Sequence, residues 1–371
     1  MMTSRQRVHA ALRREATDRI PIFMWFHPET VQRLARALEI PAESVSDVLG
    51  NDVHQTWVGN NVSMEGVRLP HEGDLYHDPW GITWVREGPF NQIRHSPLQG
   101  ADDATVSAYR YPVEAIPALL ARLDPLLADP SPYFLGVDVS PCVFEMVNRL
   151  RGMEEALLDL VANPELAFGM AAAAADFAVQ LAEAALRRHP FDWLWTGDDV
   201  GGQESMLMGP ETWRTVIKPH LARVVQVGRD RGVWVAYHSC GAIRPIIPDL
   251  IEIGVQVLNP IQGNCPGMDP FELKREYGAH LAFMGGLDTQ ELLPRASAEE
   301  VYRETRRLIE GMTSDGGGYI LAASHTVPPE TPLENIFAMY EAGGLSRQTI
   351  YDSAADVRAR RAHTCRDRSD E

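Results

Sequence analysis

The sequence predicts a single (β/α)8 barrel of the TIM type that carries a small inserted hairpin. Short apolar runs typical of buried strands alternate regularly with amphipathic helical patterns as far as residue 340. The chain has 371 residues, of which 45% are hydrophobic and 23% charged, a balance that suits one domain with a large core. Polar and ionisable residues follow nearly every strand-like run, where such barrels carry their chemistry. We therefore assign residues 1–355 to the barrel and residues 356–371 to a C-terminal tail.

The predicted strands are short and apolar. The first spans residues 20–26 and follows a helix that begins with a capping box formed by Thr3 and Gln6. Further apolar runs lie at residues 133–137, 193–195, 233–237, 255–258, 281–284 and 319–322. Strands buried on both faces read as continuous apolar runs, so this pattern indicates a parallel sheet.

Two of the intervening helices are well defined by their sequences. One begins at Ser297, whose hydroxyl can cap the helix while Glu300 reaches back. The other begins at Pro210, a favoured first helical residue. Their predicted inward faces contain Val301, Leu308, Ile309 and Met312 in the first helix, and Val216, Ile217, Leu221 and Val224 in the second. Residues 69–94 break the alternation, and residues 78–84 predict an antiparallel hairpin that covers one rim of the barrel.

Charge and composition exclude several classes of function. The net charge is −17, from 51 acidic and 34 basic residues, which disfavours binding to nucleic acid. The longest apolar stretches are far shorter than the roughly 20 residues of a membrane helix, so we expect no membrane span. The N-terminal residues do not resemble a secretory signal, and we expect a cytoplasmic protein. Its four cysteines then argue for metal binding, catalysis or simple packing rather than for disulfides. A homodimer is compatible with the sequence.

The candidate site residues are those that follow predicted strands. They are Asp198, Asp199 and Gln203 after the strand at 193–195, His238 and Cys240 after the strand at 233–237, Asn259, Asp288 and His325 after the later strands, and Glu145 after a turn at residues 139–141. Carboxylate, imidazole and thiol groups at such positions act as acids, bases or metal ligands. Asp198 and Asp199 have an alternative role as caps of the helix that follows.

Four segments resemble the uroporphyrinogen decarboxylase superfamily. They are residues 196–219, residues 237–241, residues 285–288 and residues 328–336, and the similarity extends in order over nearly the whole chain. The resemblance implies the barrel fold and one of two activities. The superfamily contains a porphyrinogen decarboxylase that needs no metal. It also contains zinc-dependent methyltransferases that exchange methyl groups between corrinoid proteins and thiols or other small acceptors.

The resemblance to the decarboxylase branch is incomplete. That branch carries a Met-Arg-Gln-Ala-Gly-Arg segment after its first strand, where the arginines hold the carboxylates of the substrate. Residues 24–29 read Met-Trp-Phe-His-Pro-Glu here, so both arginines are absent and decarboxylation of uroporphyrinogen is disfavoured. Asp52 resembles the catalytic aspartate of the family, and methyltransferase relatives also keep an acid at this place.

The methyltransferase branch is matched more closely. Its members hold zinc with a His-x-Cys pair and one later cysteine, and His238 and Cys240 match the pair. At the third position this sequence has His325, flanked by Ser324 and Thr326, where the thiol-transferring relatives have cysteine. We expect His325 to be the third zinc ligand, and Cys265 is the alternative.

The resemblance therefore favours an enzyme, a zinc-dependent methyltransferase that moves a methyl group between a small molecule and a separate protein that carries cobalamin. We expect Asp52, Asp198 and Asp199 to act in catalysis, and Glu145, Gln203, Asn259 and Asp288 to bind substrate. The chain shows no corrinoid domain of its own, because Asp52 and His54 are followed by Trp57 where the Asp-x-His-x-x-Gly signature needs glycine. Two alternatives are a cofactor-independent decarboxylase or lyase that acts on a small carboxylate, and a barrel that binds a small molecule without catalysis.

Overall fold

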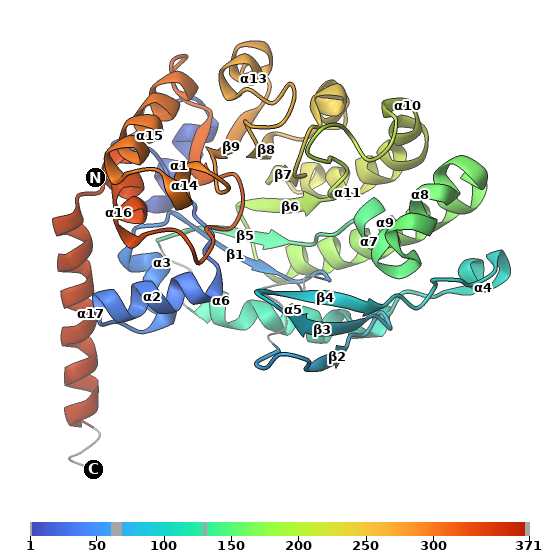
Figure 1. The fold of residues 1–371 in the computed structure, drawn as a ribbon, viewed down its shortest axis with the longest axis horizontal. Helices are drawn as coiled ribbons and strands as arrows, with labels where there is room; N and C mark the ends of the chain where they lie inside the picture. Colours follow the sequence, from blue (N-terminus) through green and yellow to red (C-terminus); the bar gives the residue numbers. More distant parts are fainter. Residues whose placement is uncertain (1, 61–68, 129–131, 368–371) are drawn as a thin grey trace.

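The chain forms a curled sheet of parallel strands surrounded by helices (Figure 1). The computed structural model describes residues 2–60, 69–128 and 132–367. The seven strands of the sheet, in spatial order, are β1 (Val53–Trp57), β5 (Phe134–Asp138), β6 (Trp193–Gly197), β7 (Trp234–His238), β8 (Val257–Ile261), β9 (Ala282–Leu287) and β10 (Tyr319–Ala323). Every neighbouring pair is parallel, and the spatial order follows the sequence. The six later strands lie within a few residues of their predicted positions.

Residues 20–26 occupy the eighth position of the barrel. Their backbone pairs with the last strand and the residues after it, since Phe23 N donates to Leu321 O at 3.0 Å and Val327 N donates to Trp25 O at 2.8 Å. On the other side the backbone hydrogen bonding among the described residues is limited to the residue just before β1, where Asp52 N donates to Ile22 O at 2.8 Å. The predicted mixed α/β barrel is therefore confirmed, although its closure between residues 20–26 and β1 is incomplete.

The helices cover the outside of the sheet. They are α1 (Ser4–Leu12), α2 (Pro28–Leu38), α3 (Val45–Val48), α4 (Asp103–Ala108), α5 (Ile116–Leu120), α6 (Asp124–Ala128), α7 (Phe144–Arg151), α8 (Met153–Ala162), α9 (Pro164–Arg188), α10 (Pro210–Thr212), α11 (Lys218–Asp230), α12 (Ile247–Glu252), α13 (Pro270–Tyr277), α14 (Leu292–Arg295), α15 (Ala298–Met312), α16 (Leu333–Ala342) and α17 (Arg347–Asp367). Both predicted capping boxes are present, at the start of α1 and of α15. The helix predicted from Pro210 runs through α10, a π-helical turn and α11. The predicted inward faces of these helices are buried.

Large side chains fill the inside of the barrel near the amino ends of the strands. Trp193 and Trp195 project inward from β6 and pack with Phe23, Val53 and Phe134. A second and larger core lies between the sheet and the helices. Because side chains fill the barrel at the amino ends of its strands, a ligand can be accepted at the carboxyl ends. The arrows of β5 and β6 point toward that end, where α7, α8 and α10 lie (Figure 1).

The predicted insertion is a three-stranded antiparallel sheet. Its strands are β2 (Leu75–His77), β3 (Thr83–Glu87) and β4 (Phe90–His95). Asp78 organises the first turn, because its side chain accepts hydrogen bonds from the backbone of Trp80 and Ile82 and from Trp84 Nε1. The predicted hairpin at residues 78–84 is thus present and is extended by one strand.

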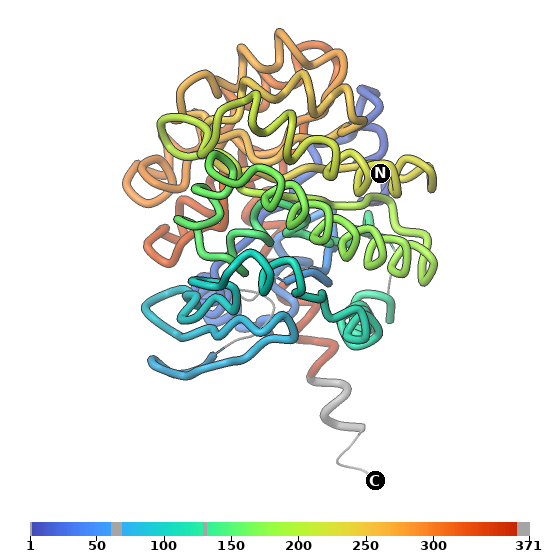
Figure 2. The backbone as a smooth tube through the Cα atoms, turned by 90° about the vertical axis from the view of Figure 1, so that its right-hand side faces the viewer, coloured from blue at the N-terminus to red at the C-terminus, as the bar shows by residue number. Residues whose placement is uncertain are grey.

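The last helix bears on the extent of the domain. The helix α17 projects beyond the barrel in both views and runs through residue 356, so the assigned start of the tail lies within it (Figures 1 and 2).

Among the described residues, only α9 is long and apolar enough to cross a membrane by length and composition. Half of its apolar window is buried, and it packs against α7, α8 and α11.

Candidate metal centre

Three predicted metal ligands meet at the carboxyl ends of the strands. His238 is the last residue of β7, Cys240 follows two residues later, and His325 lies two residues beyond β10. Their ligand atoms all lie within 4.8 Å of one another, and His238 Nε2 is 3.5 Å from Cys240 Sγ. Within the described part of the chain, this is the one group of three such residues close enough to hold a metal ion. We call these three residues the metal triad.

A neighbouring amide fixes the orientation of His238. Asn259 on β8 is 1% exposed, and its Oδ1 lies 2.6 Å from His238 Nδ1. The other end of the amide donates to Met284 O at 3.5 Å, which directs the oxygen toward the imidazole. His238 Nδ1 then carries the proton, so Nε2 presents its lone pair to the triad. Asn259 was predicted to bind substrate, and in the structure its amide instead contacts His238 and Met284.

The protein environment shifts the pKa values of two triad residues. Protein packed around the ring of His325 lowers its pKa by desolvation, and the nearby His238 lowers it further, which favours the neutral form that binds a metal. His325 still has exposed surface, whereas His238 and Cys240 are half-buried. Burial and the carboxylate of Asp199 raise the pKa of the Cys240 thiol. A thiol in this setting keeps its proton until a cation lies beside it.

Asp199 is the predicted acid that reaches the triad. Its Oδ1 accepts a hydrogen bond of 2.8 Å from Cys240 N and lies 3.7 Å from His238 Nε2. The side chain is 42% exposed, so the carboxylate borders the open mouth. Glu145 at the start of α7 lies next to it, since Glu145 Oε2 accepts from Asp199 N at 3.4 Å while its other oxygen pairs with Arg149.

Asp198 points away from the mouth and caps a helix. It is fully buried, and its Oδ1 accepts hydrogen bonds from Val143 N at 2.8 Å and from Glu145 N at 3.0 Å, at the first turn of α7. Burial raises its pKa well above the usual range. The structure therefore favours the capping alternative, although for α7 rather than for the helix that follows Asp198 in the sequence, while the other oxygen, Oδ2, is buried with no hydrogen-bond partner among the described residues.

Asp52 lies at the opposite end of the barrel from the triad. It precedes β1, whereas the triad follows the ends of β7 and β10. Its carboxylate is 0% exposed and binds Arg7 Nη1 at 2.6 Å and Arg19 Nη1 at 2.7 Å. The predicted catalytic role of Asp52 is wrong, because an ion pair at the amino ends of the strands cannot reach a substrate at their carboxyl ends.

The remaining predicted residues fall into different settings. Asp288 uses both carboxylate oxygens to accept from the backbone of residues 290–292, so it caps the turn before α14 and the predicted contact with substrate is corrected. Gln203 is exposed, and its Oε1 accepts from Gln262 Nε2 at 2.9 Å. Cys265 is buried with its sulfur 3.9 Å from Gln203 Oε1, outside the triad.

An aromatic wall beside the triad was not predicted as part of the site. The ring centroid of Trp25 lies 5.9 Å from that of His238, 5.3 Å from that of Trp57 and 5.4 Å from that of Trp195. In the sequence these residues are indistinguishable from core tryptophans. Their spacing in the barrel was the missing signal.

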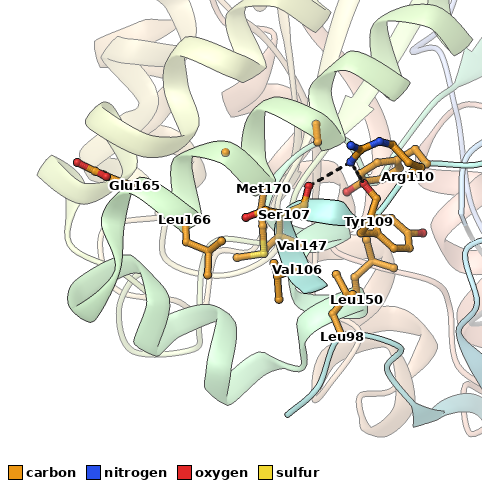
Figure 3. A pocket seen from close by; sticks show the side chains of 13 residues that line it. Leu98, Val106, Ser107, Tyr109, Arg110, Val147, Leu150, Glu165, Leu166 and Met170 are labelled. Carbon is orange, nitrogen blue, oxygen red and sulfur yellow. Dashed lines mark hydrogen bonds between the residues drawn. The ribbon is translucent and has the colours of Figure 1, made fainter. Parts of the chain in front are cut away.

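A separate cavity lies away from these residues. It has a volume of about 200 Å³ and lies between α4, α7 and α9, with Leu98, Leu166 and Met170 among its mostly apolar walls (Figure 3). Arg110 and Glu165 lie at its edge, and it contains none of the predicted site residues. The functional site therefore remains at the barrel mouth.

Comparisons with known proteins identify the family of the chain. The sequence model of the family "Uroporphyrinogen decarboxylase (URO-D)" matches residues 142–343, which is more than half of the chain and includes all three triad residues. A methylated-thiol–coenzyme M methyltransferase of Methanosarcina mazei is 24% identical over 296 residues, which cover 78% of this chain and 69% of the relative. A uroporphyrinogen decarboxylase of Thermus thermophilus is 31% identical over 134 residues, 35% of each chain. A solved structure of a methyltransferase from Methanosarcina mazei superposes with a TM-score of 0.70 at 17% identity and covers 93% of this chain and 99% of that one. The chain belongs to the uroporphyrinogen decarboxylase (URO-D) family.

Proposed function

We propose that this protein is a zinc-dependent methyltransferase that moves a methyl group between a small molecule and the cobalamin of a separate corrinoid protein in the cytoplasm. The observation that carries the proposal is the convergence of His238, Cys240 and His325 from two distant strands onto one point at the barrel mouth. The similarity to methyltransferases of Methanosarcina mazei supports the same reaction class.

The donor set of the triad fits zinc. Two imidazole nitrogens and one thiolate are ligands that zinc prefers, and three protein ligands leave a fourth position open, as catalytic zinc sites require. When bound, zinc would supply a Lewis acid for the heteroatom that carries or receives the methyl group. With a single thiolate the site would keep a positive charge, which suits activation of a methyl donor that needs help with its leaving group.

The surrounding residues have distinct tasks in this proposal. Asn259 holds the proton on His238 Nδ1 and so keeps Nε2 directed into the triad. Asp199 anchors the backbone of Cys240 and keeps its carboxylate at the mouth, where it can orient substrate or exchange a proton. Trp25 and Trp195 shield one side of the triad from water.

The decarboxylase alternative loses support from the position of its acids. It required Asp52 or Asp198 to stabilise a protonated intermediate, but Asp52 lies before β1 in an ion pair with arginine and Asp198 is fully buried as a cap of α7. The arginines that would bind several carboxylates are absent after the first strand. The alternative of a silent binding barrel differs from the proposal only in turnover, so activity decides between them.

A metal analysis with matched variants tests the proposal. Freshly purified protein should contain about one zinc per chain, counted by atomic emission. Cys240→Ala should lose the metal together with methyl transfer to added cob(I)alamin, followed by its absorbance. Cys265→Ala is the matched control, since it removes a buried thiol outside the triad and should retain both. Absence of metal before and after reconstitution, or full activity after chelation, would refute the proposal.

A further inference from the structure

The barrel wall has a gap between residues 20–26 and β1. The two segments touch at their amino ends, where Asp52 N donates to Ile22 O and the side chain of Asn51 bridges the N–H and the carbonyl of Met24. Beyond that point β1 pairs only with β5, among the described strands. Neighbouring strands of a closed barrel would be joined along their whole length. The wall is therefore open beside β1.

A cavity of about 340 Å³ occupies this gap, and we call it the lateral cavity. Successive strand residues face opposite sides of a sheet. Residues from both faces of β1 line the cavity. Val53, Gln55 and Trp57 face the barrel interior, whereas His54 and Thr56 face outward. Its outer rim is formed by residues 42–47 and by Leu126 of α6, which Figure 1 places beside β1. The lateral cavity thus passes through the wall of the barrel.

One residue lines the lateral cavity and also lies beside the metal triad. Trp25 lines the cavity, and its ring centroid is 5.9 Å from that of His238. None of the three triad residues lines the cavity, so it is a site distinct from the metal centre.

The lining of the lateral cavity favours a cation. Trp25 and Trp57 offer indole surfaces, the best aromatic partners for a cation. Glu43 and Asp47 line the outer part, and no lysine or arginine is among the lining residues. Asp47 pairs with His54 at 2.8 Å, whereas Glu43 has no ion-pair partner among the described residues. An anion would meet two carboxylates there, in a chain whose net charge is −17.

We propose that the lateral cavity is a binding site for a small organic cation such as a methylated ammonium ion. The inference goes beyond the proposed methyl transfer and gives the cation no part in the chemistry at the metal triad. The binding itself depends only on the cavity, so it can be measured without turnover.

Calorimetry with choline and its neutral isostere 3,3-dimethylbutan-1-ol tests the charge preference. The two probes have nearly the same shape, and choline should bind more tightly by about tenfold or more. Equal affinity for the two probes, or no binding of choline, would overturn the proposal.

Variants locate the probe. Ala42→Trp at the outer rim should block the cavity, and Glu43→Gln should weaken choline binding severalfold without affecting the isostere. Glu299→Gln, on the exposed first turn of α15, is the matched control and should bind choline normally. Unchanged choline affinity in Ala42→Trp would place the cation elsewhere and refute the assignment. If Cys240→Ala still binds choline, the assignment of the cation to the lateral cavity is supported even when methyl transfer fails. If the wild type transfers methyl groups but does not bind choline, the cavity assignment is refuted and the proposed methyl transfer is not.

Discussion

Replacing Asp52 with asparagine should weaken the fold and spare the metal site. The carboxylate has no exposed surface and accepts hydrogen bonds from Arg7, from Arg19 and from Ile22 N at 2.6 to 3.0 Å. Asparagine keeps the shape and one acceptor oxygen but removes the charge that neutralises the two guanidinium groups. Breaking a buried pair of this kind costs roughly 3 to 5 kcal/mol. We expect the lower end of this range, because Arg7 keeps its contact with Asp18 at 2.7 Å.

Urea unfolding followed by circular dichroism measures the loss, with the zinc content of the folded protein determined in parallel. Asp18→Asn is the matched control. Asp18 pairs with the same arginine, but its side chain is 29% exposed whereas that of Asp52 is fully buried, so its removal should cost less. If Asp52→Asn unfolded like the wild type but lost its turnover, Asp52 would act in catalysis and its placement as an ion-pair residue would be refuted.

Three further predictions concern the mouth of the barrel. Asn259→Ala should weaken zinc binding by about 10- to 100-fold in a chelator competition, because His238 loses the acceptor that fixes its tautomer, and Asn259→Asp should restore it. Asp199→Asn should retain the ion yet lose turnover, since it removes a charge without altering the N and S ligands. If Asp199→Asn lost its metal, Asp199 would itself be a metal ligand. Uroporphyrinogen should not be decarboxylated at a useful rate, because Trp25 lies against His238 where the decarboxylases carry arginines. Coproporphyrinogen formed in an anaerobic assay would contradict this.

The fold was predictable because its signals are local. Apolar runs of three to seven residues marked the strands, and the capping boxes at Thr3 and Ser297 marked helix starts that the structure confirms. Each of these patterns depends on residues close together in the chain and on their hydrophobicity, both of which can be read from the sequence. The inserted sheet was recognisable from its turn for the same reason.

The resemblance to a family brought His238 and Cys240 forward, and their spacing of two residues already places both at one strand end. The predictions that failed depended on which way a side chain points and at which end of a strand it lies, and the spacing of residues in the sequence does not encode either. Asp198 and Asp199 are adjacent, yet one turns into the wall to cap α7 and the other turns to the mouth. Asp52 lies before its strand rather than after it, which moves it to the other end of the barrel.

By itself, the sequence determined a barrel of alternating strands and helices, with a His-x-Cys pair at the end of one strand. Only the tertiary structure decided that His325 completes the triad and Cys265 does not, because the curvature of the sheet brings the ends of β7 and β10 together. It also decided that Asn259 supports His238 and that the wall opens beside β1. These features arise from contacts between strands far apart in the chain, and such contacts are set by the closure of the barrel rather than by any local pattern.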